Sequence, residues 1–215
     1  MKIAIHQPAY FPWLGYLEKI KNSDQFIYLD TVSFSKNSFD NRNRIPDEKN
    51  RSKWLTVPIK NSGRLGQIYT DCEPDNYNWL VSHLDILKQR YSSEKYFNVY
   101  FPKLCDYFKK IDKSMNLADI NFILLKFFLE SFEIKLKNPI VRMSEFKHIK
   151  GKGSDLILNI CRNFKADEYY SGRKGFDYLI FKDFELANIE LTFQDYIPES
   201  IWSSIHQLFT KGPIL

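Results

Sequence analysis

The chain has 215 residues, of which 44% are hydrophobic, 16% aromatic and 27% charged, and its formal net charge is +5. This length and composition fit one globular domain and exclude a chain that is disordered as a whole. The apolar runs are too short for a membrane span, and the first residues lack the apolar core of a signal peptide, so we expect a cytoplasmic protein.

The first thirty residues follow the order strand, loop, helix, strand. Residues 2–5 form an apolar strand that ends at His6, residues 14–21 follow a helical period, and residues 25–30 form a second buried strand. A unit of this kind has parallel strands and a right-handed connection.

Residues 31–53 are polar and rich in Asn, Arg and Lys, which predicts a long irregular loop that is either functional or mobile. Residues 54–59 form the next predicted strand, where Pro58 indicates an edge or an end, and residues 65–69 are a further short strand candidate.

Three helical periods then occupy residues 77–91, 101–111 and 117–132. We expect these helices to pack together as a helical subdomain, approximately residues 77–133, beside the sheet. The remaining pattern predicts a strand at 140–143, a helix at 155–164, and strands at 169–170 and 191–193. The whole chain, residues 1–215, is therefore predicted to be a single α/β domain with a largely parallel sheet.

The three cysteines and four histidines do not form a metal-binding pattern. Cys72, Cys105 and Cys161 match no metal-ligand spacing, and their odd number favours reduced thiols over a disulfide framework. The histidines lack the i, i+4 pairing of helical metal sites: His6, His83, His148 and His206. The sequence therefore predicts no metal.

Polar side chains leave the first two predicted strands at one edge of the sheet. Ligands of open α/β sheets bind beyond the carboxyl ends of the strands. His6 and Gln7 leave the first strand there and Asp30 closes the second, so we expect them close together. His6 and Asp30 are candidate catalytic residues because either can accept a proton, and Gln7 is a candidate substrate contact. The alternative for Asp30 is a structural turn or N-cap carboxylate.

Aromatic residues follow directly. Tyr10 and Trp13 are candidate substrate-binding residues that could form a stacking wall for a base or sugar. The alternative is a rigid loop in which Pro8, Phe11 and Pro12 close one end of the core.

Two further segments carry candidate substrate-binding residues. Lys36, Asn41 and Arg42 lie in the polar loop, where an arginine fork suits phosphate or carboxylate, although such loops are commonly just solvated. Ser171, Gly172 and Arg173 form a turn typical of phosphate contacts, without the spacing of a P-loop.

The opening segment His6-Gln7-Pro8-x-Tyr10-Phe11-Pro12-Trp13-x-Gly15 resembles the signature of the WbqC-like family, found in bacterial gene clusters for O-antigen and other surface polysaccharides. The similarity continues through Asp30 and Asn41-Arg42-Asn43 to residues 54–58. It resumes in residues 166–172, 178–179 and 189–196, and so covers essentially the whole chain. One departure is His206, which stands where an acidic residue is expected.

A weaker likeness concerns the fold. Residues 3–34 are similar in layout to the first βαβ unit of the nucleotidyltransferase-like group that includes pantoate–β-alanine ligase. Trp13-Leu14-Gly15-Tyr16 stands where that group has a His-x-Gly-His motif for ATP phosphates, so the glycine is kept and both histidines are missing. The likeness implies a Rossmann-like sheet and argues against adenylation by that group's mechanism.

The resemblance implies an enzyme of surface polysaccharide biosynthesis, and the residues favour acyl or aminoacyl transfer to a nucleotide-linked amino sugar. The donor would be an activated acyl thioester, from acyl-CoA or an acyl carrier, and no other cofactor is predicted. Arg42 and the turn at residues 171–173 would hold the diphosphate.

The alternative is a non-catalytic protein of the same pathway that binds a sugar nucleotide or a partner. Nucleic-acid binding is disfavoured, because 31 basic residues face 26 acidic ones and no nucleic-acid module is present. The sugar, the donor and the oligomeric state are not defined by the sequence.

Overall fold

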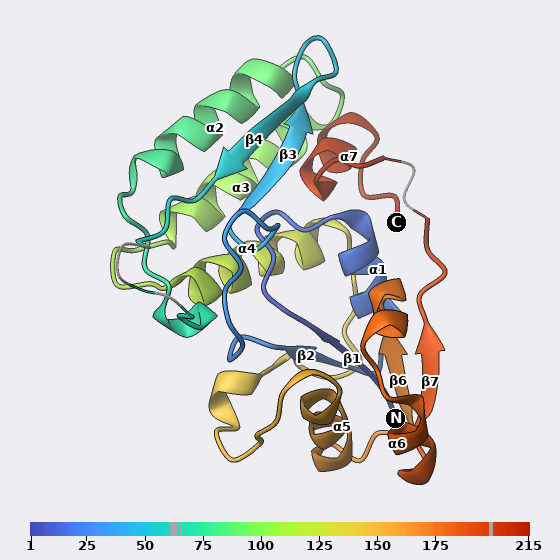
Figure 1. Ribbon diagram of the computed structural model, residues 1–215. Coiled ribbons are helices and arrows are strands. Elements are labelled where there is room, and N and C mark those ends of the chain that lie inside the picture. The colour runs from blue at the N-terminus through green and yellow to red at the C-terminus, as the bar shows by residue number, and fades with distance from the viewer. Residues whose placement is uncertain (61–63, 65, 198–199) are drawn as a thin grey trace. The chain divides into compact units, whose positions relative to one another are not determined.

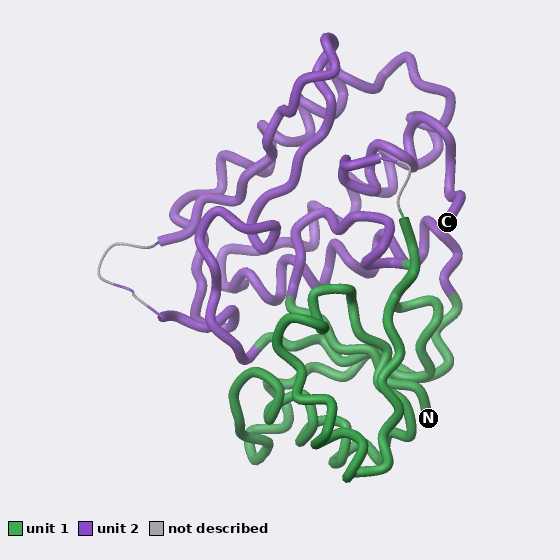
Figure 2. Tube along the Cα trace, turned by 45° about the vertical axis from the view of Figure 1, so that its right-hand side comes forward, with its two compact units in different colours: residues 1–7, 18–30, 135–197 green, residues 8–17, 31–134, 198–215 purple. Residues whose placement is uncertain are grey.

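The computed structural model describes residues 1–60, 64, 66–197 and 200–215 (Figure 1). The chain forms two compact units, coloured separately in Figure 2. Unit 1 comprises residues 1–7, 18–30 and 135–197, and unit 2 comprises residues 8–17, 31–134 and 198–215. One passage between the units falls inside helix α1 (Leu14–Lys21), so each unit is assembled from separate stretches of chain.

Unit 1 is built on a parallel sheet of five strands in the order β5-β2-β1-β6-β7 (Figure 1). Every neighbouring pair is parallel, which confirms the predicted α/β fold with a largely parallel, Rossmann-like sheet. The central strand β1 contributes three buried apolar residues in succession, as expected for a strand covered on both faces. The strands are β1 (Lys2–His6), β2 (Gln25–Tyr28), β5 (Val141–Arg142), β6 (Glu168–Ser171) and β7 (Glu190–Phe193).

The strands of unit 1 are added first on one side of β1 and then on the other. From β1 the chain moves outward to β2 and then β5, whereas β6 lies on the other side of β1 and β7 lies beyond it. The topological switch point is therefore between β1 and β6. In open α/β sheets this is where ligands bind, outside the carboxyl ends of the strands.

Helix α5 shows how the sequence pattern produces the helices of unit 1. One face of this helix is buried at helical spacing and carries Leu156, Ile157, Ile160 and Cys161. The opposite face, with Asn159 and Arg162, is exposed to solvent. The helical elements of the unit are α5 (Gly153–Asn163), α6 (Phe181–Leu186), the last half of α1, and the 3₁₀ turns η2 (Met143–Glu145) and η3 (Arg173–Asp177).

Unit 2 combines helices with a hairpin. The antiparallel strands β3 (Arg42–Pro46) and β4 (Ser52–Thr56) pair Arg42 with Thr56 and Arg44 with Trp54. The helical elements are the first half of α1, α2 (Asn78–Tyr91), α3 (Phe97–Lys109), α4 (Leu117–Ser131), α7 (Ser204–Thr210) and the 3₁₀ turn η1 (Tyr69–Asp71). The three helices predicted in residues 77–132 are all present in this unit.

Three local predictions are wrong. The predicted loop at residues 31–53 contains β3 and the start of β4. Strand β3 has no apolar alternation that would predict it, because its half-buried residues are arginines and one of its buried residues is Asn43, beside Ile45. Helix α3 begins at Phe97, four residues before the predicted start, and accommodates Pro102 in its interior. The strand predicted at residues 65–69 is absent where it is described: Ile68 forms an isolated bridge and Tyr69 begins η1, while residue 65 lies outside the described residues.

Candidate functional site

The switch point of unit 1 brings together two groups of predicted site residues. Parallel pairing matches Ala4 of β1 with Tyr170 of β6. Continued by two residues, this register sets His6 beside Gly172, so His6-Gln7 and the turn Ser171-Gly172-Arg173 leave neighbouring strands at one edge. This edge is the candidate functional site, and all its residues belong to unit 1.

His6 is held as a neutral imidazole. Its Nδ1 lies 2.9 Å from the carbonyl oxygen of Gln7, and because a carbonyl only accepts, Nδ1 carries the proton and Nε2 the lone pair. Burial lowers the pKa of His6 to about 3, and the positive charges of Lys19 and Lys174 act in the same direction. The ring is therefore uncharged at neutral pH.

Lys19 is a residue of this edge that the sequence analysis did not select. Its side chain is 3% exposed, and Nζ donates a hydrogen bond of 2.9 Å to the carbonyl oxygen of Ile5. Among the residues that the structure describes, no carboxylate lies within ion-pair distance of Nζ. Burial lowers the pKa of Lys19 to about 7, although Glu18 partly offsets the effect. Burying an amine without a counter-ion costs folding free energy, and such groups are typical of functional sites. We therefore interpret Lys19 as a residue that binds an anion or a reacting group of a ligand.

Glu18, which precedes Lys19 in helix α1, forms its hydrogen bonds with residues of other elements. Its Oε1 accepts a hydrogen bond of 3.0 Å from the hydroxyl of Tyr170, and Oε2 accepts one from the amide of Gln194. These contacts tie α1 to the ends of β6 and β7. Glu18 is therefore not an ion-pair partner of Lys19.

The turn after β6 contains one glycine that packing requires and one that it does not. A Cβ on Gly175 would lie 2.1 Å from Oγ of the buried Ser171 and 3.0 Å from Leu179. A Cβ on Gly172 would meet no atom within 4 Å, so packing of the fold leaves room above this residue. Arg173 forms an exposed ion pair of 2.6 Å with Asp195.

Replacing Gly175 by alanine is expected to destabilise the protein by about 1–3 kcal/mol, because the new methyl group overpacks the turn. The free energy of unfolding from urea denaturation measures the change. Gly172→Ala is the matched control and should stay within about 0.5 kcal/mol of wild type. Adding Ser171→Ala to Gly175→Ala should recover part of the loss; no recovery would contradict the steric explanation.

Asp30 lies two residues beyond β2, and its carboxylate is fully buried in unit 1. Oδ2 accepts hydrogen bonds from Nε of Arg142 at 2.9 Å and from Oγ of Ser144 at 2.8 Å, and Oδ1 accepts one from the Ser144 backbone at 2.8 Å. Three donors thus fix the carboxylate as an anchor between the ends of β2 and β5. Its role as a proton acceptor stays a prediction.

The other predicted site residues belong to unit 2, where two of them lie in the interior. Tyr10 is fully buried, its ring stacks on Phe11 with centroids 4.5 Å apart, and its hydroxyl lies 2.7 Å from Nδ1 of His83. Asn41 is also buried, and its amide donates to the carbonyl oxygen of Val57 at 2.8 Å. Both side chains occupy the positions of core residues.

Three predicted residues of unit 2 reach solvent. Lys36 is exposed, and Trp13 and Arg42 are half-buried. The loop that carries Trp13 is fixed at Phe11, which has a φ of 44° and whose carbonyl oxygen accepts hydrogen bonds from Asn43 at 2.6 Å and Ser203 at 2.8 Å. Because left-handed backbone is unfavourable for phenylalanine, these two bonds hold the loop in its shape.

The buried His83 predicts a pH dependence of stability. Burial lowers its pKa to about 4, against 6.5 for an ordinary histidine. Between these values the unfolded chain binds more protons than the native protein, so stability falls as the pH is lowered, by at most about 1.4 kcal/mol per pH unit for one histidine. Urea denaturation between pH 6.5 and 4.5 should show a shallower slope for His83→Gln than for wild type. The exposed His148, replaced in the same way, is the matched control for a histidine-to-glutamine substitution.

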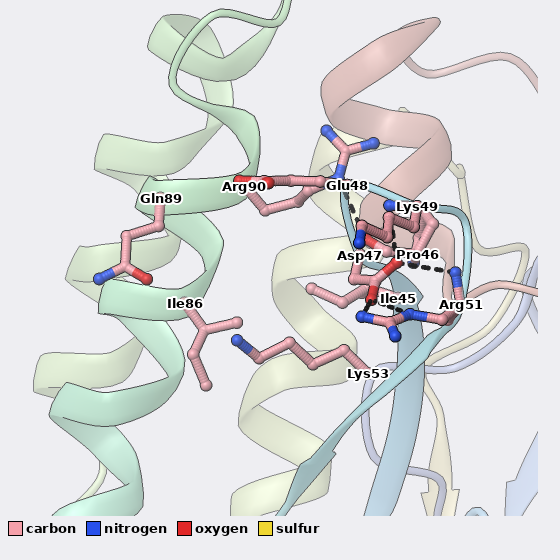
Figure 3. A pocket seen from close by; sticks show the side chains of 10 residues that line it. All are labelled: Ile45, Pro46, Asp47, Glu48, Lys49, Arg51, Lys53, Ile86, Gln89 and Arg90. Carbon is pink, nitrogen blue, oxygen red and sulfur yellow. Dashed lines mark hydrogen bonds and ion pairs between the residues drawn. The ribbon is translucent and has the colours of Figure 1, made fainter.

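A cavity of about 170 Å³ in unit 2 contains none of the predicted site residues (Figure 3). Both of its arginines already interact within the pocket: Arg51 pairs with Asp47 at 2.8 Å, and Nε of Arg90 donates to the Pro46 carbonyl at 3.0 Å. The lining residues are Ile45, Pro46, Asp47, Glu48, Lys49, Arg51, Lys53, Ile86, Gln89 and Arg90. The cavity is therefore not part of the candidate site.

Within the described ranges, His, Cys, Asp and Glu side chains nowhere gather in a group of three that could hold a metal ion. The described helices include none that is both long and apolar enough to cross a membrane. All three cysteines are free thiols.

Comparison with known proteins agrees with the resemblance found in the sequence. The uncharacterized protein Rv1507c of Mycobacterium tuberculosis is 29% identical to this chain over 198 residues, which cover 91% of this chain and 82% of that protein. No solved structure matches the chain. The sequence model of the WbqC-like protein family matches residues 7–212. With nearly its whole length covered, the chain belongs to the WbqC-like protein family.

Proposed function

We propose that this protein transfers an acyl or aminoacyl group from a thioester to the amine of a nucleotide-linked amino sugar during the assembly of a bacterial surface polysaccharide such as O-antigen or capsule. The observation that carries the proposal is the neutral His6 beside Lys19 at the switch point of unit 1. This pair suits a substrate that brings an amine with a proton to lose and phosphate groups to neutralise buried positive charge. Membership of the WbqC-like family supports the pathway.

In the proposed step, the amine nitrogen of the sugar attacks the thioester carbonyl carbon. The carbon–nitrogen bond forms, the carbon–sulfur bond breaks, and the sulfur leaves as a thiolate. The proton lost by the amine passes to Nε2 of His6 and then to the thiolate, so the products are an amide and a free thiol. We assign proton acceptance to His6 rather than Asp30, because three donors already engage the Asp30 carboxylate.

Substrate binding would prepare His6 for this role. The charges of Lys19 and Lys174 contribute to its low pKa, and an anionic diphosphate beside them would cancel that contribution and raise the pKa. Gly172, above which packing leaves space, and Arg173 belong to the same turn and are the proposed diphosphate contacts. For Tyr10, Trp13, Lys36, Asn41 and Arg42, contact with the substrate stays a prediction.

A thermal-shift screen tests the proposal, because a ligand that binds only the native state raises its stability. We expect nucleotide-linked amino sugars to raise the melting temperature and the Lys19→Met variant to reduce this shift. Lys21→Met, an exposed lysine on the same helix, is the matched control and should keep it. Sugar nucleotides that shift the protein are then incubated with acyl and aminoacyl thioesters, and mass spectrometry should detect the amide. Equal shifts in both lysine variants would contradict the assignment of the site.

A non-catalytic protein that binds a sugar nucleotide or a partner of the same pathway is the second candidate. Two observations favour it: the low pKa of His6 and the full engagement of Asp30 leave no strong base among the predicted catalytic residues of the ligand-free protein. This candidate predicts saturable shifts with sugar nucleotides and no amide from any thioester donor.

A further inference from the structure

The hairpin of unit 2 carries a cluster of aromatic and arginine side chains that reaches solvent. Phe39 and Trp54 are each 38% exposed, and their ring centroids lie 5.9 Å apart; Trp13 extends the cluster, 6.1 Å from Phe39. Two arginines of β3 complete it, together with Trp202 from the last segment of the chain, which Arg44 contacts. We name this set the aromatic–arginine platform: Trp13, Phe39, Trp54, Trp202, Arg42 and Arg44.

The guanidinium groups lie against the rings. Arg42 stands over Trp54 with 4.3 Å between the guanidinium carbon and the ring centroid. Arg44, two residues along the same strand and therefore on the same face, lies 5.8 Å from the Trp54 centroid and 6.0 Å from that of Trp202. Stacking of this kind keeps an arginine flat on a ring while leaving its N–H edge for hydrogen bonds.

Neither arginine has an acidic partner within the described part of the chain. The hydrogen bonds of their guanidinium groups go to backbone carbonyls, from Arg42 to Asn37 at 2.6 Å and from Arg44 to Ile201 at 3.3 Å. In addition, Nε of Arg42 is buried and makes no hydrogen bond. Two adjacent positive charges without a carboxylate favour a negatively charged ligand.

We propose that the aromatic–arginine platform is a binding site for a nucleoside phosphate, with the base stacked on the exposed indole of Trp54 and the phosphate held by Arg42 and Arg44. The inference concerns unit 2 alone and does not depend on the transfer reaction proposed for unit 1. A planar base matches the exposed rings, and a phosphate matches the two arginines, which can each offer paired N–H donors.

The size of the platform favours one nucleotide over a nucleic-acid strand. Proteins that bind single strands distribute their aromatic side chains along a groove, so that successive bases find successive rings. Here the rings contact one another, with centroids about 6 Å apart, and form one cluster at the hairpin. There is one exposed indole, that of Trp54, on which a base can stack from outside.

The intrinsic fluorescence of the protein can report on this site directly. Three of its four tryptophans belong to the platform, and the fourth, Trp79, is buried in the interior of unit 2. Titration with uridine, adenosine, guanosine, cytidine and thymidine 5′-diphosphates should give saturable quenching for at least one base. Trp54→Ala and Arg42→Gln should each weaken the affinity at least about tenfold.

Matched controls separate this site from the rest of the molecule. Arg51→Gln removes an arginine of the same unit that is already paired with Asp47, and His148→Ala changes an exposed residue of unit 1; both should keep the wild-type affinity. Uncharged nucleosides and inorganic phosphate should each bind more weakly than the diphosphate that combines them.

Several results would overturn the inference. One is the absence of saturable quenching by any nucleotide at millimolar concentration, and another is an equal affinity of wild type, Trp54→Ala and Arg42→Gln. Glucuronate that binds as tightly as the nucleotides would assign the platform to an anionic sugar. An affinity that rises with oligonucleotide length and falls steeply with salt would assign it to a strand. Loss of nucleotide binding in His6→Ala alone would place the nucleotide at the switch point of unit 1.

Discussion

Replacing His6 with alanine is expected to lower the rate of amide formation about 10²- to 10⁴-fold, the usual contribution of a positioned general base. The imidazole is half-buried at the end of β1, and its Nδ1 donates to the Gln7 carbonyl, so the alanine variant loses the Nε2 lone pair that accepts the proton in the proposed step. The measurement is the initial rate of amide formation with the sugar nucleotide and thioester identified by the screen, at saturating concentrations of both.

This result is informative only if the His6→Ala variant is folded. The melting temperature and circular dichroism of His6→Ala should remain close to those of wild type. His148→Ala is the matched control, because His148 belongs to the same unit and is exposed, and its rate should be unchanged. A folded His6→Ala protein with the wild-type rate would exclude His6 as the base and leave unit 1 as a binding site.

The Asp30→Asn substitution is expected to destabilise the protein by about 3 kcal/mol, because it removes the charge from one side of a buried ion pair. The side chain of Asp30 is fully buried and that of Arg142 is 19% exposed. In the variant, the charge of Arg142 would therefore lose its partner and gain little hydration in exchange. The new amide group would also direct N–H donors at a site where Arg142 and Ser144 already donate. Urea denaturation at neutral pH measures the change.

An exposed pair provides the comparison for Asp30. Asp106 and Lys109 form an ion pair of 2.8 Å whose side chains are 66% and 75% exposed, so Asp106→Asn should change stability far less than Asp30→Asn does. In the Arg142→Met background, Asp30→Asn should cost much less than in wild type. A cost that is the same in both backgrounds would show that the ion pair is not the source of the effect.

The sheet of unit 1 is predictable from the sequence because its strands are short apolar runs. Residues 2–5 and 25–28 have no other plausible environment than a covered strand, and both lie in the observed sheet. The edge was predictable for the same reason: once the strands are parallel, His6 and Ser171 must leave them on one side. The strand order was not predicted, and it is what makes β1 and β6 neighbours.

The hairpin of unit 2 and Lys19 could not be predicted, because their burial depends on partners distant in sequence. Asn43 is buried in β3 since its amide finds the carbonyl oxygen of Phe11, 32 residues earlier. Lys19 and Lys21 both lie in the last turn of α1, where the helix dipole favours lysines and their side chains are usually solvated. The burial of Lys19 follows from the approach of β1, where the carbonyl oxygen of Ile5 accepts a hydrogen bond from the lysine Nζ.

The interleaving of the two units bears on how the chain acquires its structure during translation. His6 ends β1, but its neighbour β6 begins at Glu168 and emerges from the ribosome roughly ten to thirty seconds later at ordinary elongation rates. In that interval β1 can pair only with β2, and two strands alone make a marginal sheet. The apolar residues at positions 3–5 therefore stay vulnerable to misassociation while unit 2 is being synthesised. We expect slower elongation within residues 31–134 to lower the yield of native protein.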